Sequence, residues 1–308
     1  MNILYELNRQ GYLNFKIFVA HINHGLRKNA IIDQNFVNDY CNRKNIPFFV
    51  KKVDVNKIAK KENRGLEETG RKIRYDFFEE VSKQNDANKI AIAHNLNDNA
   101  ETIIMNIIRG SGISGLKGIE PIRNNRYIRP LIEIDRTEIE EYCKEKKLNP
   151  RIDESNLENN YTRNKIRNIC IPYLKKEFNP NILINLNRLG EIAREETNYI
   201  NKLVLEAYKK VLIAKTDTQI IFSLKEFNNL DIVIKKKLII NTISNLCGTS
   251  KDIQKINIDD IIKLCNKNIG NKYLIPKKYV KILVKNKKIY FISNSKKILQ
   301  WCEIYAIF

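Results

Sequence analysis

One short stretch of the chain combines an imidazole with two carboxylates. His94, Asp98 and Glu101 follow an apolar run that ends at Ala93. In a helix, Asp98 and Glu101 share one face at its start, where they can hold an ammonium group or a hydrated magnesium ion. Acids in a first helical turn also cap the helix and answer its dipole without any ligand. The glycine-rich turn that follows, with Arg109, favours a functional site.

A second polar segment also follows an apolar run. His21 and His24 come at and after the end of the run at residues 15–22, and Arg27 lies three residues beyond. Two histidines at this spacing can ligate a metal, but no third ligand has matching spacing. We therefore expect no metal site and interpret this loop as a nucleotide contact, with Arg27 available for phosphate.

Two basic segments can meet phosphates. Arg71 and Arg74 lie on one side of a predicted helix, where they can grip one polyphosphate or pair with acids one turn earlier. Arg163, Lys165 and Arg167 begin another basic helix and suit a phosphodiester backbone. A solvated helix face explains such charges equally well, so these segments gain meaning only in combination.

The elements that must position these residues alternate in type up to about residue 150. Apolar runs at residues 15–22, 46–55 and 89–93 are typical of strands, and residues 33–45 and 66–81 are typical of amphipathic helices. Strands alternating with helices predict a parallel sheet covered on both faces. Ligands bind such sheets at the carboxyl ends of the strands, where the histidines lie.

The pattern becomes mainly helical after residue 130. Helices are predicted from Asp135 and over residues 162–215, and the strands predicted at residues 272–297 carry nine lysines and no acid. We predict an α/β domain with a doubly wound parallel sheet over residues 1–190. A mainly helical second domain is predicted over residues 191–308, with a lysine-rich strand region at its end.

Composition narrows the class of protein. The 308 residues include 55 Lys and Arg against 35 Asp and Glu, a formal net charge of +20, which favours a polyanionic partner. The six cysteines are too scattered for a zinc site, an iron–sulfur cluster or a redox dithiol. With neither a signal peptide nor a membrane-length apolar run, we expect a cytoplasmic protein without a membrane partner.

Five segments, in this order and at these separations, resemble the tRNA(Ile)-lysidine synthetase family of PP-loop ATP pyrophosphatases. The resemblance covers residues 1–190 well, and residues 200–295 are similar to the family's first C-terminal, tRNA-contacting domain. The matching blocks are His21–Arg27, Glu67–Tyr75, His94–Gly112 with Gly115-Leu116, Arg129-Pro130-Leu131 and Asp153–Arg167.

The resemblance implies a ligase that modifies tRNA in two steps. ATP, with Mg2+, adenylates the wobble cytidine of an isoleucine tRNA, and free lysine then displaces AMP to form lysidine. Asp98 and Glu101 would attract the lysine ammonium, and Arg71 would steady the developing negative charge. The nucleotide would be bound by His21, His24, His94 and Arg109, and the tRNA by Arg27, Arg74, Arg163, Lys165 and Arg167. A homodimer is a further possibility.

The chain departs from the family at several positions. The family's Ser-Gly-Gly-x-Asp-Ser loop, which cradles ATP, is absent, and so is its last C-terminal domain. Asn95 stands where the family has a second histidine, and Asn97 where it has the first of two aspartates. We therefore expect a chain truncated at both ends. One alternative is a non-catalytic tRNA-binding remnant; another is a PP-loop tRNA thiolase, against which the scattered cysteines speak.

Overall fold

The chain forms two compact units, which are described separately. Unit 1 comprises Met1–Asp98 and Glu120–Asn168, and unit 2 comprises Asn99–Ile119 and Ile169–Phe308. The predicted domains, residues 1–190 and 191–308, stay a prediction. The computed structural model describes residues 1–25, 30–151, 158–159, 161–248, 253–267, 272–277 and 279–293.

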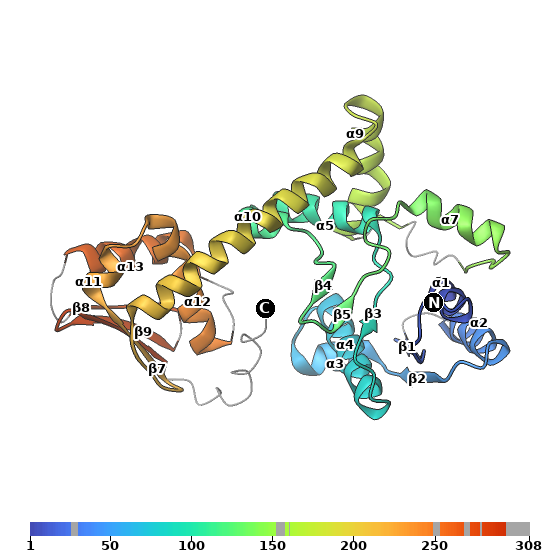
Figure 1. Ribbon diagram of the computed structural model, residues 1–308, viewed down its shortest axis with the longest axis horizontal. Helices are drawn as coiled ribbons and strands as arrows, with labels where there is room; N and C mark the ends of the chain where they lie inside the picture. Colours follow the sequence, from blue (N-terminus) through green and yellow to red (C-terminus); the bar gives the residue numbers. More distant parts are fainter. Residues whose placement is uncertain are drawn as a thin grey trace. The chain divides into compact units, whose positions relative to one another are not determined.

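The first part of unit 1 follows the predicted alternation of helices and strands (Figure 1). Strand β1 pairs in parallel with β2, from Val19 opposite Phe48 to Asn23 opposite Lys52. Both strands are shorter than predicted, and a short helix that the sequence pattern did not indicate, α3, follows β2. The elements are α1 (Asn2–Arg9), β1 (Val19–Asn23), α2 (Ala30–Arg43), β2 (Phe48–Lys52), α3 (Val55–Glu62) and α4 (Leu66–Gln84).

The rest of unit 1 contains a second parallel pair. Strand β3 (Ile90–Ala91) lies parallel to β5 (Tyr127–Ile128), and β4 (Ile122–Arg123) pairs with β5 in the antiparallel sense. The ladder continues by one bond past β3, since the Ile92 amide donates to the Ile128 carbonyl at 2.9 Å. These parallel pairs agree with the predicted fold class. They also place the residues that follow β3 beside those that follow β5.

Three helices follow the strands of this second pair along the chain: α5 comes after β3, and α7 and α8 come after β5. Helix α5 (Leu96–Ile108) begins in unit 1 and continues in unit 2. Helix α7 (Arg136–Glu145) begins after Asp135, as predicted, and the structure adds that its start is a complete capping box. Helix α8 (Thr162–Lys165) runs directly into a π-helical turn, η2 (Ile166–Cys170).

Unit 2 is mainly helical and carries an antiparallel sheet, in which β7, β8 and β9 are labelled in Figure 1. The strand order is β6-β7-β10-β9-β8. Pro172 lies in the first turn of α9, which directly follows η2, so the chain stays helical at this proline. The elements are α6 (Ile113–Leu116), α9 (Ile171–Glu177), α10 (Ile182–Val211), β6 (Leu212–Lys215), β7 (Gln219–Ser223), α11 (Leu224–Asn228), α12 (Ile232–Cys247), α13 (Lys255–Lys267), β8 (Lys272–Lys277), β9 (Val280–Lys285) and β10 (Lys288–Ser293).

The sheet of unit 2 buries one face against these helices. On β9, Val280, Ile282 and Val284 are at most 1% exposed, and they pack with apolar residues of α10–α13. Alternate residues of β9 point to the other face, as a strand requires. The predicted lysine-rich strands are thus present as β8–β10. Strands β6 and β7 were not predicted, and β6 occupies the end of the region predicted to be helical. Among the described residues, no helix has the length and hydropathy needed to cross a membrane.

Candidate functional site

The central feature of unit 1 is a histidine held by an arginine at the carboxyl ends of two parallel strands. His94 follows β3 and Arg129 follows β5, and the Arg129 Nε–H donates to His94 Nδ1 at 3.2 Å. Arg129 is itself only 5% exposed, and its Nη1 donates to the Glu120 carbonyl oxygen. The sequence analysis singled out His94, but it gave Arg129 no role beyond its place in one of the five segments that resemble the family.

His94 lies in an environment that disfavours its charged form. Burial, opposed by the Asp98 carboxylate and reinforced by Arg129, Arg163 and Arg71, lowers the pKa of His94 to about 4. The imidazole is therefore neutral at physiological pH. Its surroundings are nevertheless cationic, which suits an anionic ligand.

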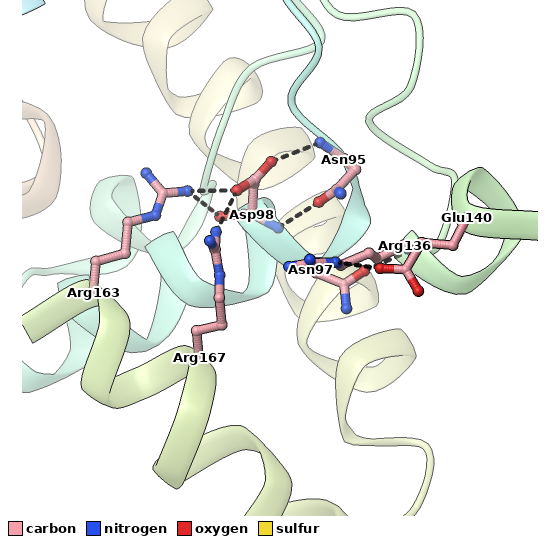
Figure 2. A network of polar contacts seen from close by, with 7 residues as sticks. All are labelled: Asn95, Asn97, Asp98, Arg136, Glu140, Arg163 and Arg167. Carbon is pink, nitrogen blue, oxygen red and sulfur yellow. Dashed lines mark hydrogen bonds and ion pairs between the residues drawn. The ribbon is translucent and has the colours of Figure 1, made fainter. Parts of the chain in front are cut away.

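Asp98 is engaged by two arginines, as Figure 2 shows. Arg163 Nη2 and Arg167 Nη2 both donate to Asp98 Oδ1, at 3.0 and 3.1 Å. The Asp98 side chain also accepts from the Asn95 amide at 3.1 Å, and the Asn95 side chain accepts from the Asp98 amide at 2.9 Å. This reciprocal pair is a capping box, so Asp98 caps α5 as well as binding arginine.

One negative and two positive charges thus meet at this point of unit 1. An added ammonium group is repelled by the excess positive charge unless the arginines move. The structure therefore brings together Asp98, Arg163 and Arg167, three residues the sequence picked out for two different tasks. Lys165 lies on the same short helix and is exposed.

A second histidine–arginine contact lies at the start of unit 1. Arg74 Nη2 is 3.4 Å from His24 Nε2, and burial lowers the pKa of Arg74. The guanidinium of Arg71, one turn earlier on α4, lies 5.4 Å from the centre of the Tyr75 ring. The structure therefore brings Arg74 of α4 beside His24, which follows β1, and places Arg71 of the same helix against Tyr75.

An aromatic stack that the sequence did not reveal supports this face of α4. The Arg123 guanidinium lies 4.7 Å from the Tyr75 ring centre and 4.6 Å from that of Tyr127. The Tyr127 hydroxyl donates to Glu79 Oε1 at 2.5 Å, which attaches β5 to α4. The available sequence signal was Arg123 and Tyr127 four residues apart in a short hairpin, but their contact with α4 depends on the fold.

The remaining candidates are more dispersed. His21 lies on β1 opposite Val50, and burial lowers the pKa of its ring, partly offset by Asp33. Glu101 belongs to unit 2 and is only 1% exposed, while Arg109, also in unit 2, is exposed. Arg27 and the Asp153 loop lie outside the described residues. In the part of the chain that the structure describes, no group of three or more His, Cys, Asp or Glu side chains could hold a metal ion.

Parallel strands with a neutral histidine and several arginines at their carboxyl ends are the arrangement in which α/β proteins bind ligands, and the arginines suit an anionic one. The model of the PP-loop domain family matches residues 1–174, and the chain belongs to this family.

Its curated relatives are tRNA-modifying enzymes by name. The chain is 46% identical over 275 residues to the tRNA(Ile)-lysidine synthase of Clostridium acetobutylicum, covering 89% of this chain and 59% of that protein. It is 39% identical over 305 residues to the tRNA(Ile)-lysidine synthase of Clostridioides difficile, covering 98% of this chain and 66% of that protein. The chain thus spans less than two thirds of the length of either relative.

A solved structure is a more distant match. It is the U34-tRNA thiolase NcsA from Methanococcus maripaludis with its 4Fe-4S cluster, at 19% identity and a TM-score of 0.49. It covers 63% of this chain and 68% of that chain. This likeness is too slight to distinguish a thiolase from a ligase.

Proposed function

We propose that this chain carries the catalytic part of a tRNA(Ile)-lysidine synthase. The observation that supports it most is the 46% identity to a lysidine synthase over 89% of the chain. In the proposed reaction, ATP adenylates the wobble cytidine of an isoleucine tRNA and pyrophosphate is released. The side-chain amine of lysine then attacks the adenylated cytidine and displaces AMP. The enzyme would act in the cytoplasm, where its tRNA is found.

The nucleotide would be bound by unit 1, around His94. His21 and His24, also in unit 1, would complete the nucleotide side of this site. The cationic side chains on α4 suit a polyphosphate, and Arg71 would steady its charge. Mg2+ fits this site as the counter-ion of the nucleotide, because magnesium is bound mainly through phosphate oxygens and water with few protein ligands.

The lysine amine would be drawn to Asp98, with Glu101 of the same helix adding negative charge. In the structure Asp98 is already paired with Arg163 and Arg167. We propose that tRNA phosphates compete for these two arginines, since guanidinium groups bind phosphate well. Their withdrawal would leave the Asp98 carboxylate to the ammonium group. Lys165, Arg74 and Arg27 would add further phosphate contacts.

The experiment is to incubate the chain with ATP, magnesium, radiolabelled lysine and isoleucine tRNA carrying a cytidine wobble base. Release of pyrophosphate reports adenylation, and label in tRNA reports lysine transfer. Asp98→Asn keeps the shape and one acceptor oxygen but removes the charge. We expect it to lose label transfer by about 10²-fold or more while tRNA binding and pyrophosphate release persist.

Asp217→Asn is the matched control, because this carboxylate is exposed in a turn of unit 2. It is expected to leave both readouts unchanged. Lysine transfer by Asp98→Asn at the wild-type rate would exclude the role given to Asp98. If the unaltered chain binds tRNA but neither releases pyrophosphate nor transfers lysine, it is a tRNA-binding remnant instead.

A further inference from the structure

The contact between Arg129 and His94 determines which form of the imidazole is present. A guanidinium group has only donors, so the group it meets at 3.2 Å must be an acceptor. Nδ1 of His94 therefore offers its lone pair and carries no proton. A doubly protonated imidazolium has no such lone pair, and the Nδ1–H tautomer would place two donors against each other.

One tautomer of His94 remains, the neutral ring with its proton on Nε2. In this tautomer Nε2–H can donate a hydrogen bond, and within the described residues none accepts from it. The tautomer is thus set by the hydrogen bond at the opposite ring nitrogen.

Arg129 is well suited to impose this form. It is 5% exposed, its Nη1 is anchored on the Glu120 carbonyl, and its amide donates to the Pro121 carbonyl at 3.0 Å. Ala91 pairs in parallel with Ile128, so the segments that follow β3 and β5 leave the sheet at the same edge. His94 lies in the first of these segments and Arg129 in the second. The guanidinium therefore cannot swing away from His94 without leaving buried partners unsatisfied.

We propose that His94 is a neutral hydrogen-bond donor, acting through Nε2–H on an anionic oxygen of a bound phosphate, and that Arg129 is the positioning residue that holds it in this form. The phosphate identity rests on the proposed function, whereas the tautomer does not. A neutral imidazole that donates to a developing negative charge is a known catalytic device.

The charged groups around His94 are consistent with this role. Asp98 follows it on α5, Arg163 comes from α8, Arg71 from α4 and Arg129 from the end of β5. Only the carboxylate favours protonation of the ring, and burial outweighs it, so the pKa of His94 lies at about 4. The ring therefore stays in its donor form from about pH 5 upwards.

The test that needs no substitution is a nitrogen NMR spectrum of the chain with labelled histidine. Only three histidines are present, and His94→Gln assigns the signal. We expect a pyridine-type Nδ1 and a pyrrole-type Nε2 for His94 that do not change between pH 5 and 8. Protonation of Nδ1, or titration of His94 near pH 6.5, would overturn the proposal.

Variants then test Arg129. Arg129→Met is expected to mix the two tautomers and to raise the pKa of His94 above its wild-type value, because a positive charge beside the ring is removed. Arg129→Lys is expected to restore part of the wild-type behaviour. Arg126→Met is the matched control, because Arg126 lies in the same hairpin but pairs with Glu79. If Arg129→Met does not fold, the wild-type spectrum still decides between the tautomers.

Inorganic pyrophosphate and ATP are the probes of the ligand. Either should shift the Nε2 signal of His94 and slow exchange of its proton; an unchanged signal with both would exclude a phosphate acceptor. In the lysine-transfer assay, the inflection contributed by His94 should lie at a higher pH in Arg129→Met than in the wild type, because one of the positive charges that lower the pKa of His94 is removed. Failure of the proposed function would remove activity from the wild type too, but would leave the tautomer and its dependence on Arg129 intact.

Discussion

At the scale of single residues, His94 links the chemistry of the site to the stability of the chain. Its pKa is about 4 in the folded state and about 6.5 when the chain is unfolded. Between pH 4 and pH 6.5, His94 is therefore protonated in the unfolded state and unprotonated in the folded state. Folding stability from this group is fully present above pH 6.5 and is lost as the pH falls toward 4.

We therefore predict that the free energy of unfolding falls between pH 7 and pH 4.5, and that His94→Gln reduces this fall. Urea unfolding at both pH values measures it. His21 contributes in the same direction, because burial lowers its pKa as well, so His21→Gln serves as a comparison. An identical pH dependence in wild type and His94→Gln would contradict the environment assigned to His94.

At the scale of elements, unit 2 relies on one buried amide to join three segments. Asn99 Nδ2 on α5 donates to Asn187 Oδ1 on α10 at 2.6 Å, and Asn99 Oδ1 accepts from the Ile119 amide at 2.6 Å. Gly118, at φ +65°, lies directly against this amide: a Cβ there would be 2.1 Å from Asn99 Oδ1. The glycine-rich segment that precedes it is thereby attached to both helices.

Gly118→Ala is predicted to lower the stability of unit 2 by about 2–4 kcal/mol, because it combines backbone strain with loss of a buried hydrogen bond. Denaturant unfolding followed by circular dichroism measures the effect. Gly112→Ala is the control, since no atom lies within 4 Å of its Cβ and its φ is −70°. That substitution is expected to change stability by less than about 0.5 kcal/mol, and equal effects at both glycines would refute the account.

At the scale of the whole molecule, the net charge of +20 has a structural counterpart in the sheet of unit 2. Lys281 and Lys285 alternate with the buried residues of β9, and Lys288 on β10 lies directly opposite Lys285. Like charges opposite each other in a sheet destabilise it. Phosphate groups bound to this face would neutralise the charges and offset their mutual repulsion.

Replacing Lys281, Lys285 and Lys288 together by Gln is predicted to weaken tRNA binding and to reduce the slope of log affinity against log salt by about 2–3. Filter binding at several salt concentrations measures both. The control replaces three exposed lysines on the helical side of unit 2: Lys202, Lys209 and Lys225. If both triple variants lose the same slope, the effect comes from net charge and not from this face of the sheet.

What the sequence determined by itself was the local order of elements and the residues at their ends. Periodicity and turn residues placed His94 after a strand and Asp98 in a first helical turn, because those signals depend on near neighbours. Only the tertiary structure decided their partners. Arg129 is 35 residues from His94, and Arg163 and Arg167 are 65 and 69 residues from Asp98. Long-range pairing and packing decide which strands are neighbours, and therefore which arginine contacts His94. The sequence around each residue does not predict these contacts.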